Sequence, residues 1–540
     1  MEMSSHGSEG GVERLGKINE SPSNSEMSTR IGFYETYQVP QPRTFLAWSN
    51  SSSDDNLNQQ QINTAFVNLL SLIQWPDIPL KELQYCNSTS PKQSQYHIVN
   101  KRVKYKVGET LEVLIMAKDH MARPKTYGGD FFQVKLHSPK LKAGVTGHVK
   151  DYRNGSYLAT FLLPWPGKAQ VNIRLIHSSE AVSVLKDKRE KHPDKVFFHG
   201  HFQSNGVSEV KECNLKVSGE NICEYKDPVT EEIWQCVKPQ KLPCDSWIYH
   251  SMGGYRQVTN AVENALLSRS VTNKNIPSTE SSINIEPQST IDLTSSLSVC
   301  KTGQEPTQPS GYYYKDQWTS LVCMGRHFPQ PDDARACLRG KDIYMFGDST
   351  LRQWFEYLEN FIPSLKRIDL HLNYQSGPLL AVDADYGIVM RWRAHGLPLR
   401  TTKTLTSNLH YEAAYIYGIG GGPYTVVVIT LWAHFTTYPI AVYLQRLARV
   451  QKAVASLLFR SPQTTILIKS ANTGYKSIYG SDWLSLQLDI LMRAAFKGMA
   501  VTVLDAWDMT SCHYLPDTIH PGPPIVRNEV DLMLSYICPK

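Results

Sequence analysis

The chain has 540 residues, of which 41% are hydrophobic and 20% are charged, so its composition is that of a folded protein rather than a disordered one. It is too long for one ordinary hydrophobic core, and we therefore expect two domains. The 56 Lys and Arg against 50 Asp and Glu leave a formal charge of +6 without any dense basic block, which argues against nucleic acid as a partner.

The N-terminal residues 1–60 are predicted to form a disordered polar tail. They are rich in Ser and Asn and offer too little apolar surface to offset the entropy of ordering. From Ala65 to Trp75, apolar residues recur at helical spacing, which predicts a short amphipathic helix packed on a neighbouring domain.

A β-sheet domain is predicted next, at residues 61–250. Between Leu111 and about Gly200, runs of β-forming residues are separated mostly by Gly, Pro or Asn: LEVLIMA, DFFQVKL, VTGHVKD, GSYLATFLL, AQVNIRLI and KVFFHG. This spacing predicts an antiparallel, immunoglobulin-like β-sandwich. Its end is rich in cysteine, and four cysteines allow three pairings, among which spacing does not choose. They are Cys213, Cys223, Cys236 and Cys244.

The cysteines and glycosylation sequons indicate an oxidising compartment. None of the ten cysteines forms a C-x-x-C motif, which favours disulfides over a zinc or thioredoxin-type site. Asn50, Asn87 and Asn154 each begin an N-x-[ST] sequon. We expect a secreted or Golgi-lumenal protein. Because Met1 to about Tyr37 contains no signal-peptide core or spanning helix, we expect a signal or anchor segment to lie outside the sequence given.

The C-terminal half has a different periodicity. Residues 251–310 are rich in Ser, Thr and Asn and predict a linker. In residues 311–540, apolar strands such as DIYMF, TVVVITLW, TTILIKS and MAVTVLD alternate with helical stretches such as 439–459. This alternation predicts a parallel, three-layer α/β sheet.

Reactive side chains are expected at the carboxyl ends of these strands. Ser349, in Gly-Asp-Ser-Thr, follows the first strand and opens a helix, whose N-terminus can stabilise an oxyanion. A serine nucleophile needs a base held by an acid. The loop after the last strand supplies His520 as the base and Asp517 as its orienting acid, three residues apart. Each motif alone is weak, since Gly-Asp-Ser is more often a helix N-cap, but their positions make the combination specific.

These residues resemble a known family. FGDSTLRQW and the late D-x-x-H are similar to the PC-esterase branch of the GDSL/SGNH hydrolases, and the chain from about Lys101 to Cys538 resembles the neurexophilin and PC-esterase domain (NXPE) family. Further matching stretches are YGGDFFQVKLHSP, VTGHVKDYRNGSY, CLRGKDIYMFGDST, VLDAWD and YIC. The resemblance implies a neurexophilin-like β-sandwich followed by an SGNH-hydrolase-like domain that transfers or removes acetyl groups on glycans, with sialic acid as an expected acceptor. Ser349 matches the nucleophile, His520 the base and Asp517 the acid.

Three further positions are candidates for substrate or oxyanion contact. SGNH enzymes carry an Asn after the third strand, where this chain has His434, which is either such a contact or a satisfied loop histidine. Arg352 either fixes a carboxylate or the oxyanion, or pairs with Glu356 one helical turn on. The backbone donor of the second SGNH block is either Gly377 or one of residues 420–422, and the sequence does not choose.

The expected reaction forms an acyl-serine that is resolved by water or by a sugar hydroxyl. Hydrolysis needs no cofactor, whereas transfer needs an acetyl donor such as acetyl-CoA. We expect no metal, because no His, Cys, Asp and Glu cluster has ligand spacing. The expected partner is a glycan or glycoprotein substrate. The alternative is a secreted protein whose sandwich binds a cell-surface receptor while the esterase domain is inactive; retention of serine, acid and base in order favours the enzyme.

Overall fold

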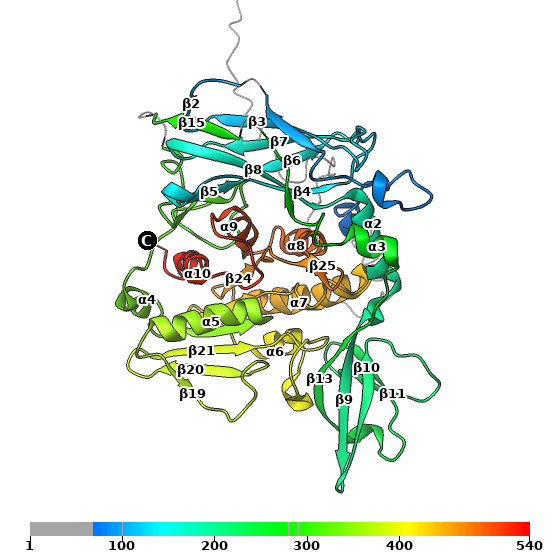
Figure 1. Cartoon of the computed structure of the whole chain (residues 1–540). Helices are drawn as coiled ribbons and strands as arrows, with labels where there is room; N and C mark the ends of the chain where they lie inside the picture. The colour runs from blue at the N-terminus through cyan, green and yellow to red at the C-terminus, as the bar shows by residue number, and fades with distance from the viewer. Residues whose placement is uncertain (1–67, 100, 279–280, 289–291, 540) are drawn as a thin grey trace, which may run out of the picture.

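The computed structural model describes residues 68–99, 101–278, 281–288 and 292–539, which form a sheet-rich, two-part α/β protein with several sheets (Figure 1). The predicted polar tail and Asn50 lie outside the described residues. Of the helix predicted at Ala65–Trp75, residues 68–75 are described: residues 68–71 are helical, whereas residues 72–75 are not. The segment that follows packs between the two parts, where Trp75 contacts Phe131 and Trp483 edge to face.

Within the described residues, two sheets enclose the core of the N-terminal part. The first has the order β1-β3-β7-β6 and the second β17-β16-β5-β4-β8-β15-β2, with β14 attached to β8. Alternate residues such as Val113 on β3 and Leu136 on β4 point into one shared buried cluster. The strands are β1 (Gln95–Ile98), β2 (Tyr105–Lys106), β3 (Thr110–Met116), β4 (Phe131–Ser138), β5 (Ala143–Thr146), β6 (His148–Asp151), β7 (Ser156–Leu162), β8 (Gly167–His177), β14 (Lys274–Asn275), β15 (Ser282–Glu286), β16 (Gly311–Tyr314) and β17 (Gln317–Ser320).

Part of the segment predicted as a linker, residues 251–310, forms strands of this sheet instead. β14 and β15 both pair with β8, and Ile283 and Ile285 of β15 are buried in the shared core. β16, at the start of the predicted α/β domain, pairs with β5. Polar residues are accommodated here because strand pairing needs backbone hydrogen bonds and one apolar face, and β15 supplies both.

A third sheet, of order β11-β12-β10-β9-β13-β22, extends away from the rest of the molecule at the lower right of Figure 1. The disulfides Cys213–Cys236 and Cys223–Cys244 lie in it, which selects one of the three pairings that the sequence left open. Its strands are β9 (Val196–Ser204), β10 (Val207–Asn214), β11 (Ile222–Lys226), β12 (Ile233–Val237), β13 (Trp247–Tyr255) and β22 (Thr404–Leu405).

The C-terminal part is centred on a sheet of order β19-β20-β21-β18-β23-β24-β27. The strands from β21 to β27 are parallel, and β19 and β20 are antiparallel additions at one edge. The strands are β18 (Asp342–Phe346), β19 (Lys366–Ile368), β20 (Leu379–Asp383), β21 (Ile388–Arg393), β23 (Thr425–Ile429), β24 (Thr465–Lys469) and β27 (Val501–Leu504), with a small hairpin of β25 (Lys476–Ser477) and β26 (Gly480–Ser481).

Alternate residues of β23 belong to two buried clusters. Val426 and Val428 share one cluster with α5 and α10, whereas Val427 and Ile429 share the other with α7 and α8. The helices are α2 (Ser179–Lys191), α3 (Ala261–Leu266), α4 (Pro331–Cys337), α5 (Ser349–Phe361), α6 (Glu412–Gly418), α7 (Ile440–Arg460), α8 (Asp482–Phe496), α9 (Ala506–Cys512) and α10 (Pro523–Ile537), and the 3₁₀ turns are η1 (Tyr85–Asn87), η2 (Pro139–Leu141), η3 (Pro193–Lys195), η4 (Cys244–Ser246) and η5 (Thr406–Asn408).

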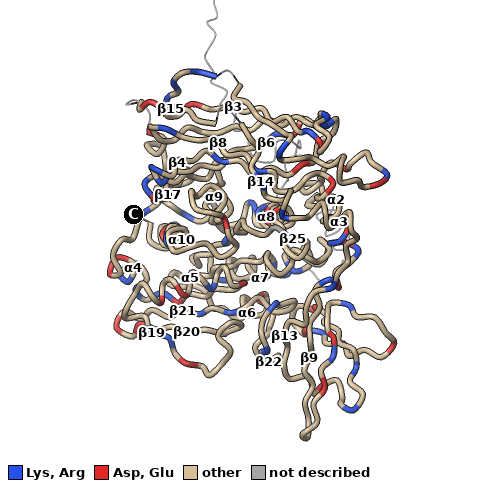
Figure 2. Tube along the Cα trace, in the orientation of Figure 1, with Lys and Arg blue, Asp and Glu red and all other residues tan. Residues whose placement is uncertain are grey.

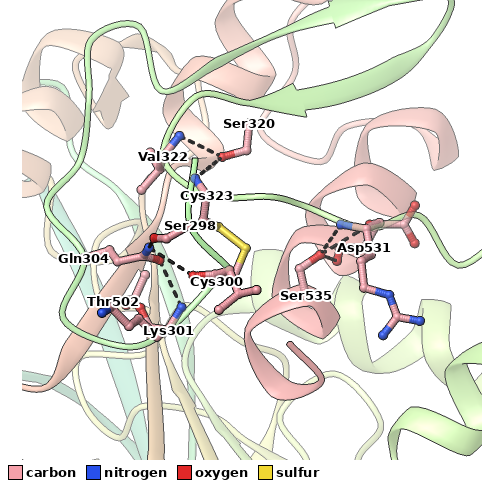
Figure 3. Close-up of a disulfide and its surroundings, with 12 residues drawn as sticks. Ser298, Cys300, Lys301, Gln304, Ser320, Val322, Cys323, Thr502, Asp531 and Ser535 are labelled. Atoms are coloured by element: carbon pink, nitrogen blue, oxygen red, sulfur yellow. Dashed lines mark hydrogen bonds between the residues drawn. A yellow bond between two sulfur atoms is a disulfide. The ribbon is translucent and has the colours of Figure 1, made fainter. Parts of the chain in front are cut away.

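Two more disulfides lie in the C-terminal half, and one of them, between Cys337 and Cys538, ties the start of the α/β part to its end. Cys337 of α4 is bonded to Cys538 beyond α10, and Cys300 is bonded to Cys323. Figure 3 shows the second bond, beside which the Ser320 hydroxyl accepts hydrogen bonds from the N–H groups of Val322 and Cys323. The four disulfides of the described part are consistent with a secreted or lumenal protein.

Charges of both signs alternate along the trace in Figure 2 rather than gathering into one patch. None of the helices in the described ranges is long and apolar enough to cross a membrane.

The two remaining cysteines predict a simple labelling pattern. Cys86 is exposed, whereas Cys512 is buried and burial raises the pKa of its thiol. We expect iodoacetamide to alkylate Cys86 in the native protein and Cys512 after unfolding without reduction, as read by peptide mass spectrometry. Equal native labelling of both thiols would contradict the packing of α9 described here.

Candidate functional site

Ser349 opens α5 directly after β18. Asp348 caps the helix, with its Oδ1 accepting hydrogen bonds from the N–H (2.9 Å) and hydroxyl (2.7 Å) of Thr350. Gly347 has no room for a side chain, because a Cβ would overlap Thr430 at the end of the neighbouring strand. The serine is therefore held in the first helical turn, where N–H groups lack intrahelical partners and the dipole favours negative charge.

His520 lies against this serine, with its Nε2 2.8 Å from the Ser349 Oγ. Ser349 is half-buried and His520 is exposed, so the pair opens to solvent. Desolvation lowers the pKa of His520; the negative charges of Asp348 and Glu356 oppose this effect, and nearby cations add to it. A neutral imidazole at this distance can accept the serine proton.

The loop that carries His520 rests on the carboxyl end of β24. Asn472 donates from Nδ2 to the Ile519 carbonyl (2.9 Å), and Gln353 of α5 donates to the Pro521 carbonyl (3.3 Å). Gly474 lies so close to the loop that a Cβ would overlap the backbone of residues 518–519. These contacts could have been sought from the sequence, since residues 471–474 directly follow the predicted strand TTILIKS.

The structure pairs the Asp517 carboxylate with Arg174 of β8, and its role as the acid that orients His520 stays a prediction. Arg174 Nη1 donates to Asp517 Oδ1 at 2.7 Å. The acidic groups that act most strongly on His520 are instead Asp348 and Glu356. A nearly buried carboxylate is stabilised by a guanidinium, which supplies both an opposite charge and hydrogen-bond donors. No sequence signal links residues 174 and 517.

His434 lies beside the pair and is held by a histidine that the sequence did not single out. Its Nδ1 is 3.0 Å from Nε2 of His395, which follows β21, and both side chains are buried. Burial holds the pKa of His434 well below its ordinary value, and the charge of Arg400, together with those of His395 and His520 when they are protonated, acts in the same direction. Burial also lowers the pKa of His395, to about 3, so both rings are neutral at pH 7.

The other predicted candidates are placed as follows. Arg352 donates from Nε to Glu356 (2.9 Å) and from Nη1 to the Gln375 carbonyl (2.7 Å), so the helical pair forms while its charge still acts on His520. The Gly377 N–H is used by the Asn373 carbonyl at 2.9 Å.

Residues 420–422, the other candidates for the second SGNH block, precede β23. They lie at the amino ends of the parallel strands, whereas Ser349 lies at the carboxyl ends. Gly396 follows β21, so it lies at the carboxyl ends of the strands, as Ser349 does. The sequence did not point to Gly396 because β20 and β21 were not predicted.

The described sequons differ in exposure. Asn154 is exposed in the turn between β6 and β7, where its side chain accepts from the Ser156 N–H (3.0 Å). Asn87 is half-buried and its Oδ1 accepts from Arg123 (2.8 Å). In the described part of the chain, no group of three or more His, Cys, Asp or Glu has the geometry to hold a metal ion.

Comparison with known proteins adds two family matches. A model described as "NXPE family member 4-like, C-terminal domain" matches residues 318–538, and a model described as "Neurexophilin" matches residues 62–270. Among solved structures, FdeC, described as a broadly conserved adhesin of Escherichia coli, is 12% identical with a TM-score of 0.14. That match covers 36% of this chain and 65% of the FdeC chain, and a likeness this weak bears on neither fold nor function.

The lowered pKa of His520 predicts the pH dependence of Ser349 reactivity. Only the neutral imidazole accepts the serine proton, so labelling of Ser349 by a fluorophosphonate should rise with pH through a midpoint below the ordinary histidine value of 6.5. The measurement is the labelling rate between pH 4 and 9, with Ser349→Ala as the blank. A midpoint above 6.5 would mean that a carboxylate stabilises the protonated ring.

Gly474→Ala should slow this labelling by displacing the loop that carries His520. The matched control is Gly219→Ala, because both glycines have a φ of +127° but a Cβ at Gly219 meets nothing within 4 Å. Both changes should cost about 1–3 kcal/mol in unfolding free energy. If the two variants label at the same rate, Gly474 does not position the loop.

Proposed function

We propose that this chain, which belongs to the neurexophilin and PC-esterase domain (NXPE) family, is a glycan O-acetyltransferase or O-acetyl esterase that forms an acyl-serine at Ser349. The observation that carries the proposal is the 2.8 Å contact between Ser349 Oγ and His520 Nε2 at the N-terminus of α5. A nucleophile, a neutral base and a helix N-terminus therefore lie together at the carboxyl ends of the parallel strands.

The strand order supports a finer assignment of the fold. β21, β18, β23, β24 and β27 follow the order 2-1-3-4-5 of a doubly wound sheet, whose ligands bind at carboxyl strand ends beside the first strand. We therefore assign the α/β part to the three-layer SGNH-hydrolase type. The N-terminal pair of sheets is assigned to a neurexophilin-like, immunoglobulin-like sandwich, which the family match to residues 62–270 supports.

In the proposed mechanism, the Ser349 hydroxyl attacks the acetyl carbonyl carbon while its proton passes to His520 Nε2. His520 then gives this proton to the leaving group. Water or a sugar hydroxyl attacks the carbonyl carbon of the acetyl-serine and gives its proton to His520. The bond between the acetyl carbon and Ser349 Oγ then breaks, acetate or the acetylated sugar leaves, and His520 returns the proton to Ser349 Oγ. The Ser349 N–H is one expected oxyanion donor, and His434 is the candidate for a second, in the place of the SGNH asparagine.

The surroundings of the site suit a charged glycan. The open position of His520 admits a substrate that is part of a larger molecule, and Arg352 supplies positive charge for the carboxylate of sialic acid. Tyr374 is 40% exposed beside Arg352 and offers an aromatic face. Trp354, Trp432 and Trp507 are buried, so their rings are not available to stack on a sugar. Acetyl-CoA is the proposed donor for transfer, and a secreted or Golgi-lumenal location would supply the glycoprotein.

The proposal predicts that acetyl chemistry depends on Ser349. Wild type, Ser349→Ala and the control Ser456→Ala are secreted from cells and incubated with sialylated glycans plus acetyl-CoA, or with O-acetylated glycans alone. We expect wild type and the control to change the acetyl mass, and Ser349→Ala to be slower by at least about 10³-fold. Mass spectrometry of the glycans gives the direction of the change, which separates transferase from esterase.

Equal activity of wild type and Ser349→Ala would remove Ser349 as the nucleophile. If all three proteins are inert with every substrate, the enzyme proposal fails and the receptor-binding alternative takes its place.

A further inference from the structure

The sandwich and the loop that carries His520 are in direct contact. α9, which ends where this loop begins, lies against β4, β5 and β16 (Figure 1). Lys135 of β4 donates to the His513 carbonyl at 2.6 Å, and the Thr146 and Ser511 hydroxyls are 3.0 Å apart. Gly144 of β5 lies so close to Cys512 that a Cβ would overlap its carbonyl. The outer face of the second sheet therefore fixes the beginning of the loop.

Arg174 fixes the middle of the loop. Its Nη1 donates to Asp517 (2.7 Å) and its Nη2 to the Gln133 side-chain oxygen (2.9 Å). The side chains of Arg174 and Asp517 are 13% and 4% exposed, so the ion pair is largely shielded from water. A planar guanidinium bound on two sides allows little movement of either partner.

The hydrogen bonds continue from Arg174 to the far side of the same loop. Gln133 donates from Nε2 to Asp482 Oδ2 (3.0 Å), and Asp482 Oδ1 accepts from the N–H groups of Gly474 (2.8 Å) and Tyr475 (2.7 Å). Gly474 in turn packs against the backbone of residues 518–519. The loop is thus enclosed between Arg174 on one side and the segment after β24 on the other, directly before His520.

We infer that Arg174 of the N-terminal sandwich is a positioning residue of the active site, acting through Asp517 to hold His520 against Ser349. The inference rests on the proposed function. Its consequence is that the sandwich, whatever else it binds, is required for the chemistry of the α/β part. Without Arg174, the nearly buried carboxylate of Asp517 loses the guanidinium that is hydrogen-bonded to it, and a shift of this carboxylate displaces the residues that follow.

The structure also suggests a chemical rescue. A cavity of about 450 Å³ lies between the sandwich, α8 and α9, and Arg174, Gln133 and Lys135 are part of its lining. A guanidinium ion from solution can therefore reach the space that Arg174→Ala leaves empty. The ion would restore the charge at Asp517 without restoring the covalent link to β8.

The test uses the full chain as wild type, Arg174→Ala, Arg174→Lys and Lys168→Ala. Lys168 is an exposed cation on the same strand and is the matched control. We expect fluorophosphonate labelling of Ser349 to slow by at least about 10-fold in Arg174→Ala, to recover with millimolar guanidinium and to be intermediate in Arg174→Lys. Lys168→Ala should be labelled at the wild-type rate. Guanidinium should not accelerate labelling of either wild type or Lys168→Ala.

Hydrogen exchange of residues 513–521 is measured on the same proteins, and faster exchange confined to Arg174→Ala supports the inference. Unchanged labelling and unchanged exchange in Arg174→Ala would overturn it, as would slower labelling that tracks only a loss of folded protein and shows no rescue. If wild type is not labelled at Ser349, the proposed function fails, and the exchange rates alone decide whether Arg174 holds the loop.

Discussion

The loop between α9 and α10 has to keep His520 within 2.8 Å of Ser349 although residues 513–522 belong to no helix or strand. Backbone without regular pairing keeps one conformation only when its polar groups find other partners. Here the carbonyls of His513, Ile519 and Pro521 accept from Lys135, Asn472 and Gln353, and the Asp517 carboxylate accepts from Arg174. The partners come from both parts of the chain, so the geometry of the pair is a property of the whole assembly.

The same assembly sets the charge states around the pair. His395 and His434 are buried and neutral, whereas the Asp348 side chain caps α5 and accepts from the Ala433 N–H (3.3 Å). Arg446 is buried as well, between Glu412 and Glu232, and donates to the carbonyl of His395 (2.9 Å). Because Glu232 belongs to the cysteine-rich sheet, that sheet is also connected to the histidines beside the site.

The two family matches cover separate stretches of sequence, one after the other. In the folded protein, however, strands from the two halves of the chain pair with each other. β16 lies at the start of the predicted α/β domain but pairs with β5 in a sheet of the N-terminal part. β22 comes from within the α/β part of the chain and pairs with β13 of the third sheet. Chain segments on each side of residue 310 therefore contribute to the same sheets. This sharing explains why contacts such as Lys135 to His513 are short and partly buried, unlike those between two loosely linked domains.

Elements whose signal is local could be predicted from the order of the residues alone. Apolar runs predicted β18, β23 and β24, a glycine and a capping aspartate placed Ser349 at a helix N-terminus, and the D-x-x-H spacing singled out His520. Tertiary structure decided what depends on distant partners. Arg174 pairs with Asp517 across 343 residues, His395 meets His434 between two strands, and β15 forms from a polar segment because β8 offers an edge. Local patterns record which face of an element is apolar, whereas the partner of a buried charge is chosen by packing, which no window of sequence contains.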